Sequence, residues 1–320
     1  MFMPKVFVLV LSYNGLKWLK DCLPSVVAMD YSNYETVVID NGSSDGTQEF
    51  LSVSYPQIQV VSLNPNRGYA GGFNAGLEYA AEHGAEYFLV MNNDTEIDPH
   101  ALTALVETAQ SRERVGFVTG KVYFHDRGDV FQSVGKQGDT VIWGGRHIGY
   151  EEKDVGQYDK ITKRDFVDDI YVLVSRDMYD ETGGYDSQLF LHCEELDWQL
   201  RAKKAGWQMY YTPHAWLWHH GSVTIGGVGS AINNYFLERS RIIVMAKHGA
   251  LVRLFRYIAW SGSHALYRFF GAIYRRNPNT IKPRLARIIG IWAGLFWLVH
   301  RQPITGVPKG IQKLSQRVDS

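Results

Sequence analysis

In Tyr-Phe-Leu-Val-Met-Asn-Asn-Asp-Thr-Glu (residues 87–96) an apolar run ends abruptly in oxygen-bearing side chains, and the fold prediction starts from this pattern. The short apolar run predicts a buried strand. Carboxylate and amide oxygens at the end of a strand suit a hard cation such as Mg2+ or Mn2+. Asp94 is the preferred ligand, and the alternative is a turn that caps the helix expected from Pro99.

Segments on either side of this stretch alternate between strand-like and helix-like patterns. Such a β-α-β rhythm predicts an open, mostly parallel sheet with helices on both faces, in which polar residues at the strand ends converge on a ligand. The expected strands are Val6–Ser12, Glu35–Asp40, Ile58–Leu63 and Tyr87–Met91, and the expected helices are Trp18–Met29, Thr47–Ser54, Gly72–His83 and Pro99–Ser111.

The rest of the chain departs from this rhythm. Glycines and aromatic residues between Gly135 and Tyr150, Trp143 among them, predict hairpins and loops. Elsewhere we expect a strand pair near Val115–Phe124, strands at Phe166–Ser175, Gln208–Tyr211 and Ala215–His219, and helices at Met178–Gly183, Glu195–Ala205, Asn233–His248, Leu251–Tyr274 and Ile281–Val299. The predicted domains are 1–230, in two halves at about 1–115 and about 116–230, and a helical region at 231–320.

Composition places the chain among ordinary globular proteins, with 45% hydrophobic and 21% charged residues. Its two cysteines, Cys22 and Cys193, form no disulfide framework or metal-ligand spacing, which suits a reducing compartment. The N-terminal apolar run Val6–Leu11 is too short for a secretory signal and is expected to be a strand.

Charge is strongly polarised along the chain. Residues 239–320 contain 15 Lys or Arg and one Asp or Glu, whereas residues 1–238 contain 18 and 32. Apolar residues with Arg at helical spacing predict that 239–318 docks on an anionic membrane surface, which places the protein in the cytoplasm, peripheral at the inner face of the plasma membrane. A soluble helical cap or a homo-oligomer interface is the alternative. Nucleic acid is not an expected partner, because no binding module accompanies the charge.

Two loops between strands and helices are candidate phosphate and nucleoside sites. Asp40–Thr47 carries two carboxylates before a helix N-terminus. A carboxylate there can accept a hydrogen bond from a base N–H or a ribose hydroxyl, and the backbone N–H groups favour phosphate. Capping of the helix is the alternative. Asn64–Gly76 is glycine-rich, which permits close approach of a ligand, and its Arg67 can pair with a diphosphate or remain a surface charge.

The segment 192–198 concentrates Glu194, Glu195 and Asp197 at the start of a predicted helix. Carboxylates are common in a first helical turn. Here apolar neighbours imply partial burial, which raises a carboxyl pKa toward that of a general base. Downstream, His219 or His220 can complete a metal site or serve as a packing residue.

Six motifs in this order resemble family 2 glycosyltransferases of the GT-A fold, and the rhamnosyltransferase-like branch is the nearest likeness. The resemblance extends over about residues 4–225. The motifs are Val-Leu-Ser-Tyr-Asn-Gly (10–15), Asp-Asn-Gly-Ser-Ser-Asp-Gly-Thr (40–47), Asn-Arg-Gly-Tyr-Ala-Gly-Gly-Phe-Asn-Ala-Gly (66–76), Asn-Asn-Asp-Thr (92–95), Gly-Gly-Tyr-Asp (183–186) and Glu-Glu-Leu-Asp-Trp-Gln-Leu-Arg (194–201).

The resemblance implies roles for individual residues. Asp94 is the metal-binding carboxylate of a DxD-like element, and His219 joins the metal shell. Glu195 stands where the family carries the Asp that acts as catalytic base, with Glu194 and Asp197 as rivals. Asp40 contacts a pyrimidine base, and the nucleotide-sugar site also includes Ser12, Tyr13, Asn14, Asn41, Ser43, Asp45, Arg67, Gly68, Gly71, Asn74, Asn92 and Asn93. The implied acceptor site consists of Asp169, Gly184, Tyr185 and Trp198. The resemblance also assigns nucleotide binding to the half at about 1–115 and acceptor binding to the half at about 116–230.

The implied function is inverting transfer of a sugar in cell-surface polysaccharide synthesis. The donor is a dTDP- or UDP-sugar, with L-rhamnose as the sugar of the nearest branch, and Mn2+ or Mg2+ assists. The acceptor is a glycan or a lipid-linked saccharide. The alternatives are a nucleotide-sugar-binding protein without transfer activity and a hexosyl or galactofuranosyl transferase that uses a UDP-sugar. A Rossmann oxidoreductase is disfavoured, because residues 12–15 lack its glycine motif.

Overall fold

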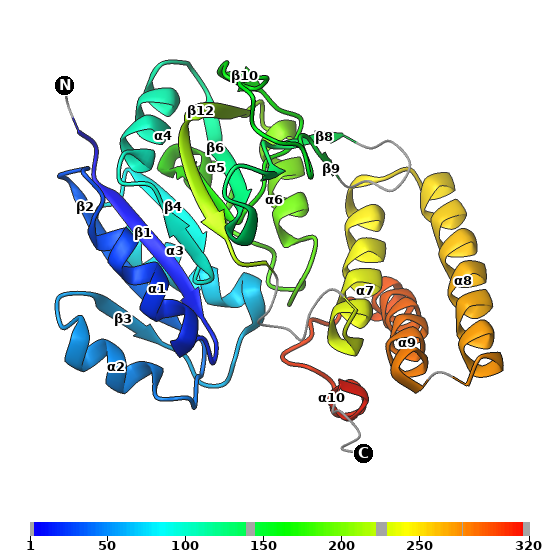
Figure 1. Cartoon of the computed structure of the whole chain (residues 1–320). Coiled ribbons are helices and arrows are strands. Elements are labelled where there is room, and N and C mark those ends of the chain that lie inside the picture. Colours follow the sequence, from blue (N-terminus) through cyan, green and yellow to red (C-terminus); the bar gives the residue numbers. More distant parts are fainter. Residues whose placement is uncertain (1–2, 139–144, 222–228, 277, 316–320) are drawn as a thin grey trace. The chain divides into compact units, whose positions relative to one another are not determined.

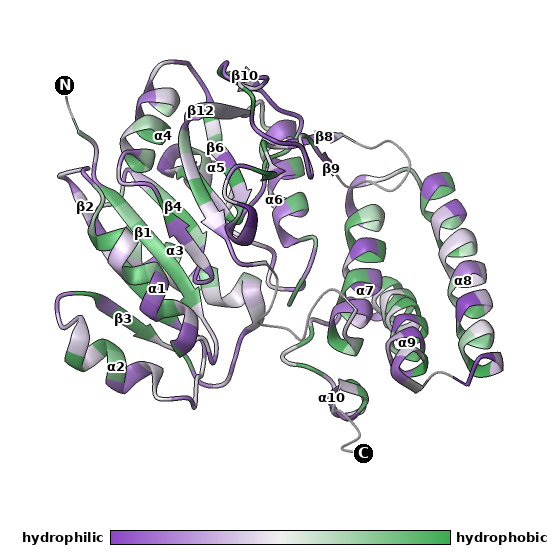
Figure 2. Ribbon diagram, viewed as in Figure 1, coloured by the Kyte–Doolittle hydropathy of each residue, from purple (hydrophilic) through white to green (hydrophobic). Residues whose placement is uncertain are grey.

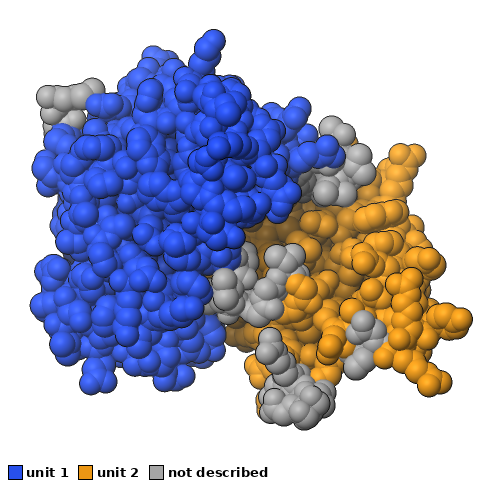
Figure 3. Space-filling model, viewed as in Figure 1, with its two compact units in different colours: residues 1–66, 71–185, 198–221 blue, residues 67–70, 186–197, 222–320 orange. Residues whose placement is uncertain are grey.

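The computed structural model of the chain describes residues 3–138, 145–221, 229–276 and 278–315, and forms two compact units (Figures 1 and 3). Unit 1 consists of residues 1–66, 71–185 and 198–221. Unit 2 consists of residues 67–70, 186–197 and 222–320. The segments 67–70 and 186–197 therefore group with the C-terminal helices, although they are far from them in sequence. The domain boundary near residue 230 stays a prediction.

Unit 1 contains a mixed sheet whose strand order is β10-β12-β6-β11-β4-β1-β2-β3. Strands β1, β2, β3 and β4 pair in parallel, and so do β6 and β12, whereas β11 runs antiparallel to both β4 and β6. The strands of this sheet are β1 (Val6–Ser12), β2 (Tyr34–Asp40), β3 (Gln59–Ser62), β4 (Tyr87–Asn92), β5 (Thr95–Ile97), β6 (Val115–Phe124), β7 (Phe131–Ser133), β10 (Thr162–Lys163), β11 (Tyr171–Ser175) and β12 (Gln208–His219), and a separate pair consists of β8 (Lys136–Gly138) and β9 (Gly145–His147).

Helices connect the strands of unit 1 as the sequence rhythm predicts. They are α1 (Leu16–Val27), α2 (Thr47–Ser54), α4 (Ala101–Gln110), α5 (Arg176–Thr182) and the 3-10 helix η1 (His125–Arg127), whereas α3 (Gly68–Glu82) and α6 (Glu194–Lys204) begin with residues of unit 2. Gly76 lets α3 pack closely, because a Cβ there would lie 2.7 Å from the Ile39 side chain of β2. The glycines of α3 thus serve helix packing as well as the loop before it.

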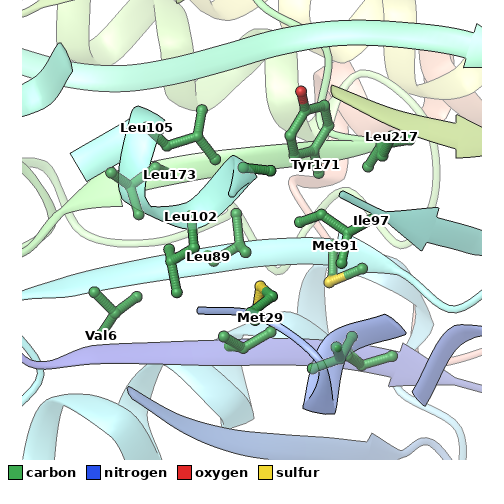
Figure 4. Close-up of a cluster of buried hydrophobic side chains, with 14 of the residues drawn as sticks. Val6, Met29, Leu89, Met91, Ile97, Leu102, Leu105, Tyr171, Leu173 and Leu217 are labelled. Carbon is green, nitrogen blue, oxygen red and sulfur yellow. The ribbon is translucent and has the colours of Figure 1, made fainter. Parts of the chain in front are cut away.

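The core of unit 1 explains why these strands read as nearly continuous apolar runs. Buried strands of a parallel sheet contact apolar groups on both faces. Figure 4 shows Leu89 and Met91 of β4 with Leu102 and Leu105 of α4 in one buried cluster. Burial of this cluster fixes the register of β4, and hence the position of the polar residues that follow it.

Unit 2 is helical apart from its short segments. Its helices are α7 (Ala231–His248), α8 (Leu251–Tyr274), α9 (Pro278–His300) and α10 (Lys309–Ser315). The hydroxyl of Ser230 accepts from the N–H of Asn233 and caps α7. Green apolar segments alternate with purple polar ones along α8 and α9 in Figure 2. No helix among the described residues has the length and apolar character needed to cross a bilayer.

Three predicted strand boundaries differ from the structure. β6 is one ten-residue strand in place of a strand pair, and the strand expected at Phe166–Ser175 begins only at Tyr171. The two strands expected at 208–219 form one strand, β12, with an irregularity between Tyr211 and Trp216. Trp143 lies outside the described residues.

Candidate active site

Three loops at the carboxyl ends of β1, β2 and β4 meet at one edge of the sheet. Ser12 and Asp40 are paired in register at the last positions of β1 and β2. The side-chain amide of Asn93 donates to the Ser12 hydroxyl at 3.1 Å. A Cβ on Gly15 would lie 2.0 Å from the Asn93 amide nitrogen, so only glycine fits there. The predicted convergence of the loops that follow these strands is therefore present in the fold.

The carboxylates of the β2 loop are held by hydrogen bonds within unit 1. Asp40 is fully buried and accepts from the Ser43 N–H at 3.0 Å and from the Gln48 amide at 2.6 Å. Asp45 accepts from the N–H of Leu16 at 2.9 Å, which begins α1, and from Thr47, which begins α2. Desolvation alone would raise the pKa of Asp45, but these hydrogen bonds hold it below its ordinary value.

Asn14 joins the same network from the β1 loop. Its backbone has a φ of 49°, its N–H donates to the Ser43 hydroxyl at 2.9 Å, and its side-chain oxygen accepts from the Ser44 N–H at 2.8 Å. Tyr13 beside it is 42% exposed and offers a ring to solvent. Asp45 and Asn14 thus preorganise two loops, and their contact with a nucleoside stays a prediction.

Asp94, in the loop after β4, comes together with His219, the last residue of β12. The Nε2 atom of His219 lies 3.2 Å from the Asp94 Oδ1, and both side chains are buried. The Oε1 of Gln132 lies 2.8 Å from the other ring nitrogen of His219, Nδ1. With the Gln132 amide in this orientation Nδ1 is the donor, and the lone pair of Nε2 in a neutral ring is then directed at the Asp94 carboxylate, where a cation would bind.

This pair fits a divalent cation. Two ligand atoms about 2.1 Å from one ion at angles of about 90 to 110° stand roughly 3.0 to 3.4 Å apart, a range that contains the observed separation. A second hydrogen bond that fixes the metal-binding tautomer, here the one between Nδ1 and the accepting Oε1 of Gln132, is usual for a ligand histidine. The remaining ligands would come from water and the donor diphosphate, since Asn92 and Asn93 carry no charge.

Other predicted nucleotide-sugar residues contribute backbone contacts or structural support. The N–H of Asn41 donates to the Ser12 carbonyl at 2.8 Å, and that of Asn92 to the Ile170 carbonyl at 2.9 Å. In unit 2, Arg67 is exposed and Gly68 has a φ of 73°. Gly71 opens the part of α3 that belongs to unit 1 and is half-buried.

Asn74 supports the Gly183-Gly184 turn of unit 1. Its amide donates to the Tyr185 carbonyl at 2.8 Å and accepts from the Tyr185 N–H at 2.9 Å. Tyr185 is 4% exposed and packs edge-on against Trp198, which is 1% exposed. Both rings are therefore buried packing residues in this structure. Their contact with an acceptor stays a prediction, and in this structure the two rings expose almost no surface to make it. Asp169, half-buried before β11, also stays a predicted acceptor residue.

The three acidic residues of the first turn of α6 have different surroundings within unit 2. Asp197 is fully buried and its Oδ1 lies 2.5 Å from the Lys247 ammonium and 2.8 Å from the His248 ring. Glu194 is 4% exposed, whereas Glu195 is half-buried. Of these three, Glu195 is the carboxylate that solvent or a substrate reaches most readily.

The backbone before this turn is strained. His192 and Cys193 have φ values of 66° and 64°, a region that non-glycine residues rarely occupy. Neighbouring helices hold the segment: the Ser240 hydroxyl of α7 donates to the Leu191 carbonyl at 2.8 Å, and Trp297 of α9 donates to the Gln188 side chain at 2.8 Å. Strain kept in place by such contacts often marks a functional site.

Sequence reasoning did not find Gln132, Gly15 or Lys247. Gln132 lies on the short strand β7, and its residue type gives no signal. The Asn14-Gly15 pair reads as a turn, with no indication that a side chain is excluded there. Lys247 was predicted to be part of the membrane-binding segment 239–318, although part of its role is to neutralise Asp197. Cys22 and Cys193 are both buried and neither forms a disulfide.

Comparison with known proteins defines the class first. A mannosyltransferase from Pyrobaculum calidifontis, solved with GDP-Man and Mn2+, superposes with a TM-score of 0.58 over 92% of this chain and 88% of that protein at 14% identity. This likeness shows the GT-A fold of glycosyltransferases. The chain belongs to glycosyl transferase family 2, whose model matches residues 7–180.

Relatives of known activity differ in what they make. An N-acetylglucosaminyl-diphospho-decaprenol L-rhamnosyltransferase of Mycobacterium tuberculosis is 25% identical over 240 residues, which cover 68% of this chain and 77% of that protein. A poly-beta-1,6-N-acetyl-D-glucosamine synthase of Staphylococcus epidermidis is 24% identical over 222 residues, 69% of this chain. The match spans 51% of that synthase. The family and its transferase class are thus established, while the relatives have different sugars in their names.

Proposed function

We propose that this chain is an inverting glycosyltransferase that moves a sugar from a nucleoside diphosphate donor to a hydroxyl of a glycan or lipid-linked saccharide. The observation that carries the proposal is the difference between the carboxylates of the first turn of α6. Asp197 is fully buried and paired with Lys247, whereas the side chain of Glu195 is only half-buried. A general base has to reach the proton that it removes, so Glu195 is the base.

In the proposed mechanism each of these residues has one task. Asp40 and the loop around Asp45 hold the nucleoside, and the N-terminus of α2 favours the diphosphate. Glu195 takes the proton of the acceptor hydroxyl while its oxygen attacks the anomeric carbon. The bond from that carbon to the diphosphate breaks, and the sugar configuration inverts. A divalent ion held by Asp94 and His219 would neutralise charge on the leaving diphosphate.

L-Rhamnose carried by dTDP is the donor that we propose, and the mycobacterial L-rhamnosyltransferase supports it. The product would belong to a cell-surface polysaccharide. A hexosyl or galactofuranosyl transferase that uses a UDP-sugar is the second candidate, because Asp40 can accept from the N–H of either pyrimidine.

A panel of nucleotide sugars tests the donor and the need for metal together. Purified protein is incubated with each donor, a lipid-linked saccharide acceptor and Mn2+, Mg2+ or EDTA, and release of nucleoside diphosphate is measured. We expect release with dTDP-rhamnose and metal, and none with EDTA. Preference for a UDP-sugar would select the second candidate, and donor binding without release would favour a nucleotide-sugar-binding protein.

We also propose that α8 and α9 dock on the anionic inner face of the plasma membrane. Along α8, exposed apolar side chains recur at helical spacing at Val252, Phe255, Ala259, Leu266 and Phe270. On α9, Trp292, Phe296 and Val299 continue the pattern with exposures of 68%, 55% and 76%. Such stripes suit shallow insertion between lipid headgroups.

Not all of the basic excess serves this surface. Arg287 pairs with the buried Glu238 at 2.6 Å, and Lys247 pairs with Asp197 and Asp186. The exposed basic residues that remain for anionic lipid are Arg256, Arg268, Arg275, Arg276, Arg301, Lys309 and Lys313. Residues 316–318 of the predicted membrane-binding segment lie outside the described residues.

Flotation of the full-length protein with anionic liposomes tests this docking. We expect the wild type to float and Phe270→Glu or Trp292→Glu to remain in the dense fraction. The matched control is Val53→Glu, since Val53 of α2 is 76% exposed but belongs to unit 1. Equal flotation of the wild type and the α8 and α9 variants would refute membrane docking and favour a soluble cap or an interface between subunits.

A further inference from the structure

Three side chains outside the predicted metal pair meet where three chain segments end in unit 1. Glu96 lies in β5, His125 begins η1 directly after β6, and His220 directly follows β12. β5 pairs with β12 so that Glu96 stands opposite Trp218. β12 pairs in parallel with β6 so that His219 stands opposite Phe124. The residues that follow this last pair, His220 and His125, are therefore placed side by side by the sheet register.

The three side chains present ligand atoms to one point. The His125 Nε2 lies 2.8 Å and the His220 Nε2 lies 3.5 Å from the same carboxylate oxygen of Glu96. All three ligand atoms lie within 4.8 Å of one another. Tetrahedral zinc bonds of about 2.0 to 2.1 Å place ligand atoms about 3.3 to 3.4 Å apart, so small side-chain rotations would complete the geometry.

The surroundings of the imidazoles favour a ligand over simple packing. The His220 Nε2 atom is buried and makes no hydrogen bond with any described residue. A buried nitrogen without a hydrogen bond costs free energy, and a metal ion would satisfy it. His125 is exposed, so an ion can enter from solvent. The two rings stack with centroids 3.7 Å apart and an interplanar angle of 25°, so the exposed His125 ring has to rotate for both lone pairs to meet at one ion.

We propose that Glu96, His125 and His220 form a second metal site, selective for zinc-like ions and distinct from the Asp94 and His219 pair. Two imidazoles and one carboxylate suit Zn2+, and three protein ligands leave a fourth position open to water or a substrate group. The two sites share a short connection, because the His220 N–H donates to the Asp94 carbonyl at 2.9 Å. An ion here would connect the ends of β5, β6 and β12. β12 ends in His219, and β5 begins directly after Asp94.

Metal titration of the full-length protein tests this site without any turnover. Co2+ is titrated as a spectroscopic probe, and Zn2+ affinity is measured by competition with a chromophoric chelator. The variants are His125→Ala and Glu96→Gln for the new site, Asp94→Asn for the donor site, and His214→Ala as a control on an exposed histidine of β12. Far-UV circular dichroism checks that each variant is folded.

We expect one tetrahedral Co2+ and one tight Zn2+ in the wild type, His214→Ala and Asp94→Asn. His125→Ala and Glu96→Gln should each weaken Zn2+ binding at least tenfold. Absence of tight Zn2+ binding in the wild type would overturn the proposal. So would Zn2+ binding that Asp94→Asn removes and His125→Ala retains, because the ion would then belong to the donor site.

Discussion

Replacement of Asp197 by Asn should destabilise unit 2 without removing the proposed base. Asn has the shape of Asp but no charge, so the ammonium of Lys247 loses its closest partner at 2.5 Å and His248 loses its carboxylate. Removal of one partner from a fully buried ion pair costs about 3 to 5 kcal/mol. Lys247 is 24% exposed and keeps Asp186 at 2.7 Å, so the lower value of about 2 to 3 kcal/mol is expected.

Thermal and urea unfolding of the full-length variant measure this cost. For a protein of 320 residues, with an unfolding entropy of about 2.1 cal/mol/K per residue, a loss of about 2 to 3 kcal/mol lowers the Tm by roughly 3 to 5 °C. The matched control is Asp21→Asn on the exposed face of α1, which should leave the Tm unchanged. Asp197→Asn should retain turnover below its Tm. An unchanged Tm, or a folded variant without any turnover, would refute the assignment of Asp197 as a structural partner and Glu195 as the base.

Three further changes test the donor loops and the buried charges of unit 1. Gln132→Leu removes the hydrogen bond that fixes the His219 tautomer and should raise the Mn2+ concentration for half-maximal activity about 10- to 100-fold, with little change in Tm. Gly15→Ala should weaken donor binding at least tenfold in calorimetry, because its Cβ would lie 2.0 Å from the side-chain nitrogen of Asn93 and displace the loop after β4. Asp168→Asn should cost about 3 kcal/mol at pH 7, since this buried carboxylate pairs with Lys136 at 3.0 Å.

The pH dependence of that last variant follows from the sign of the pKa shift. Desolvation would raise the pKa of Asp168, but the Lys136 charge and the hydrogen bonds of its neighbours lower it well below its usual range. A lowered folded-state pKa gives stability that is fully present above the unfolded value of about 3.9 and is lost as the pH falls further. The stability gap between wild type and Asp168→Asn should therefore narrow below about pH 4 in urea unfolding. A difference in the free energy of unfolding between the two proteins that stays constant from pH 7 to pH 3 would contradict the lowered pKa of Asp168.

Local patterns carried most of the fold prediction and part of the site. The strands β1, β2 and β4 were predicted because short apolar runs between turn residues are visible in sequence, and the parallel sheet then brings Ser12, Asp40 and Asn93 together. Two strands were predicted in place of β12, because the irregularity between Tyr211 and Trp216 arises in its pairing with β6, which is distant in sequence. A Cβ on Gly120 of β6 would lie 2.1 Å from the Ala215 carbonyl, so the two strands adapt to each other.

Contacts between residues far apart in sequence could not be predicted. Nothing local to Lys247 indicates that it pairs with Asp197, and nothing local to Gln132 indicates that it meets His219. The basic segment 239–320 was therefore interpreted as one membrane-binding surface, whereas two of its cations, Lys247 and Arg287, neutralise carboxylates inside unit 2. Choice among Glu194, Glu195 and Asp197 likewise needed their surroundings, since all three lie in one helical turn.

The most direct test of the account is acceptor-dependent release of nucleoside diphosphate by Glu195→Gln, with donor affinity measured in parallel by calorimetry. Loss of a general base lowers kcat by about 10²- to 10⁴-fold. We predict a loss in that range with donor Kd within about twofold of the wild type, and partial activity in Glu195→Asp, which keeps the carboxylate. Turnover by Glu195→Gln close to that of the wild type would contradict the central claim.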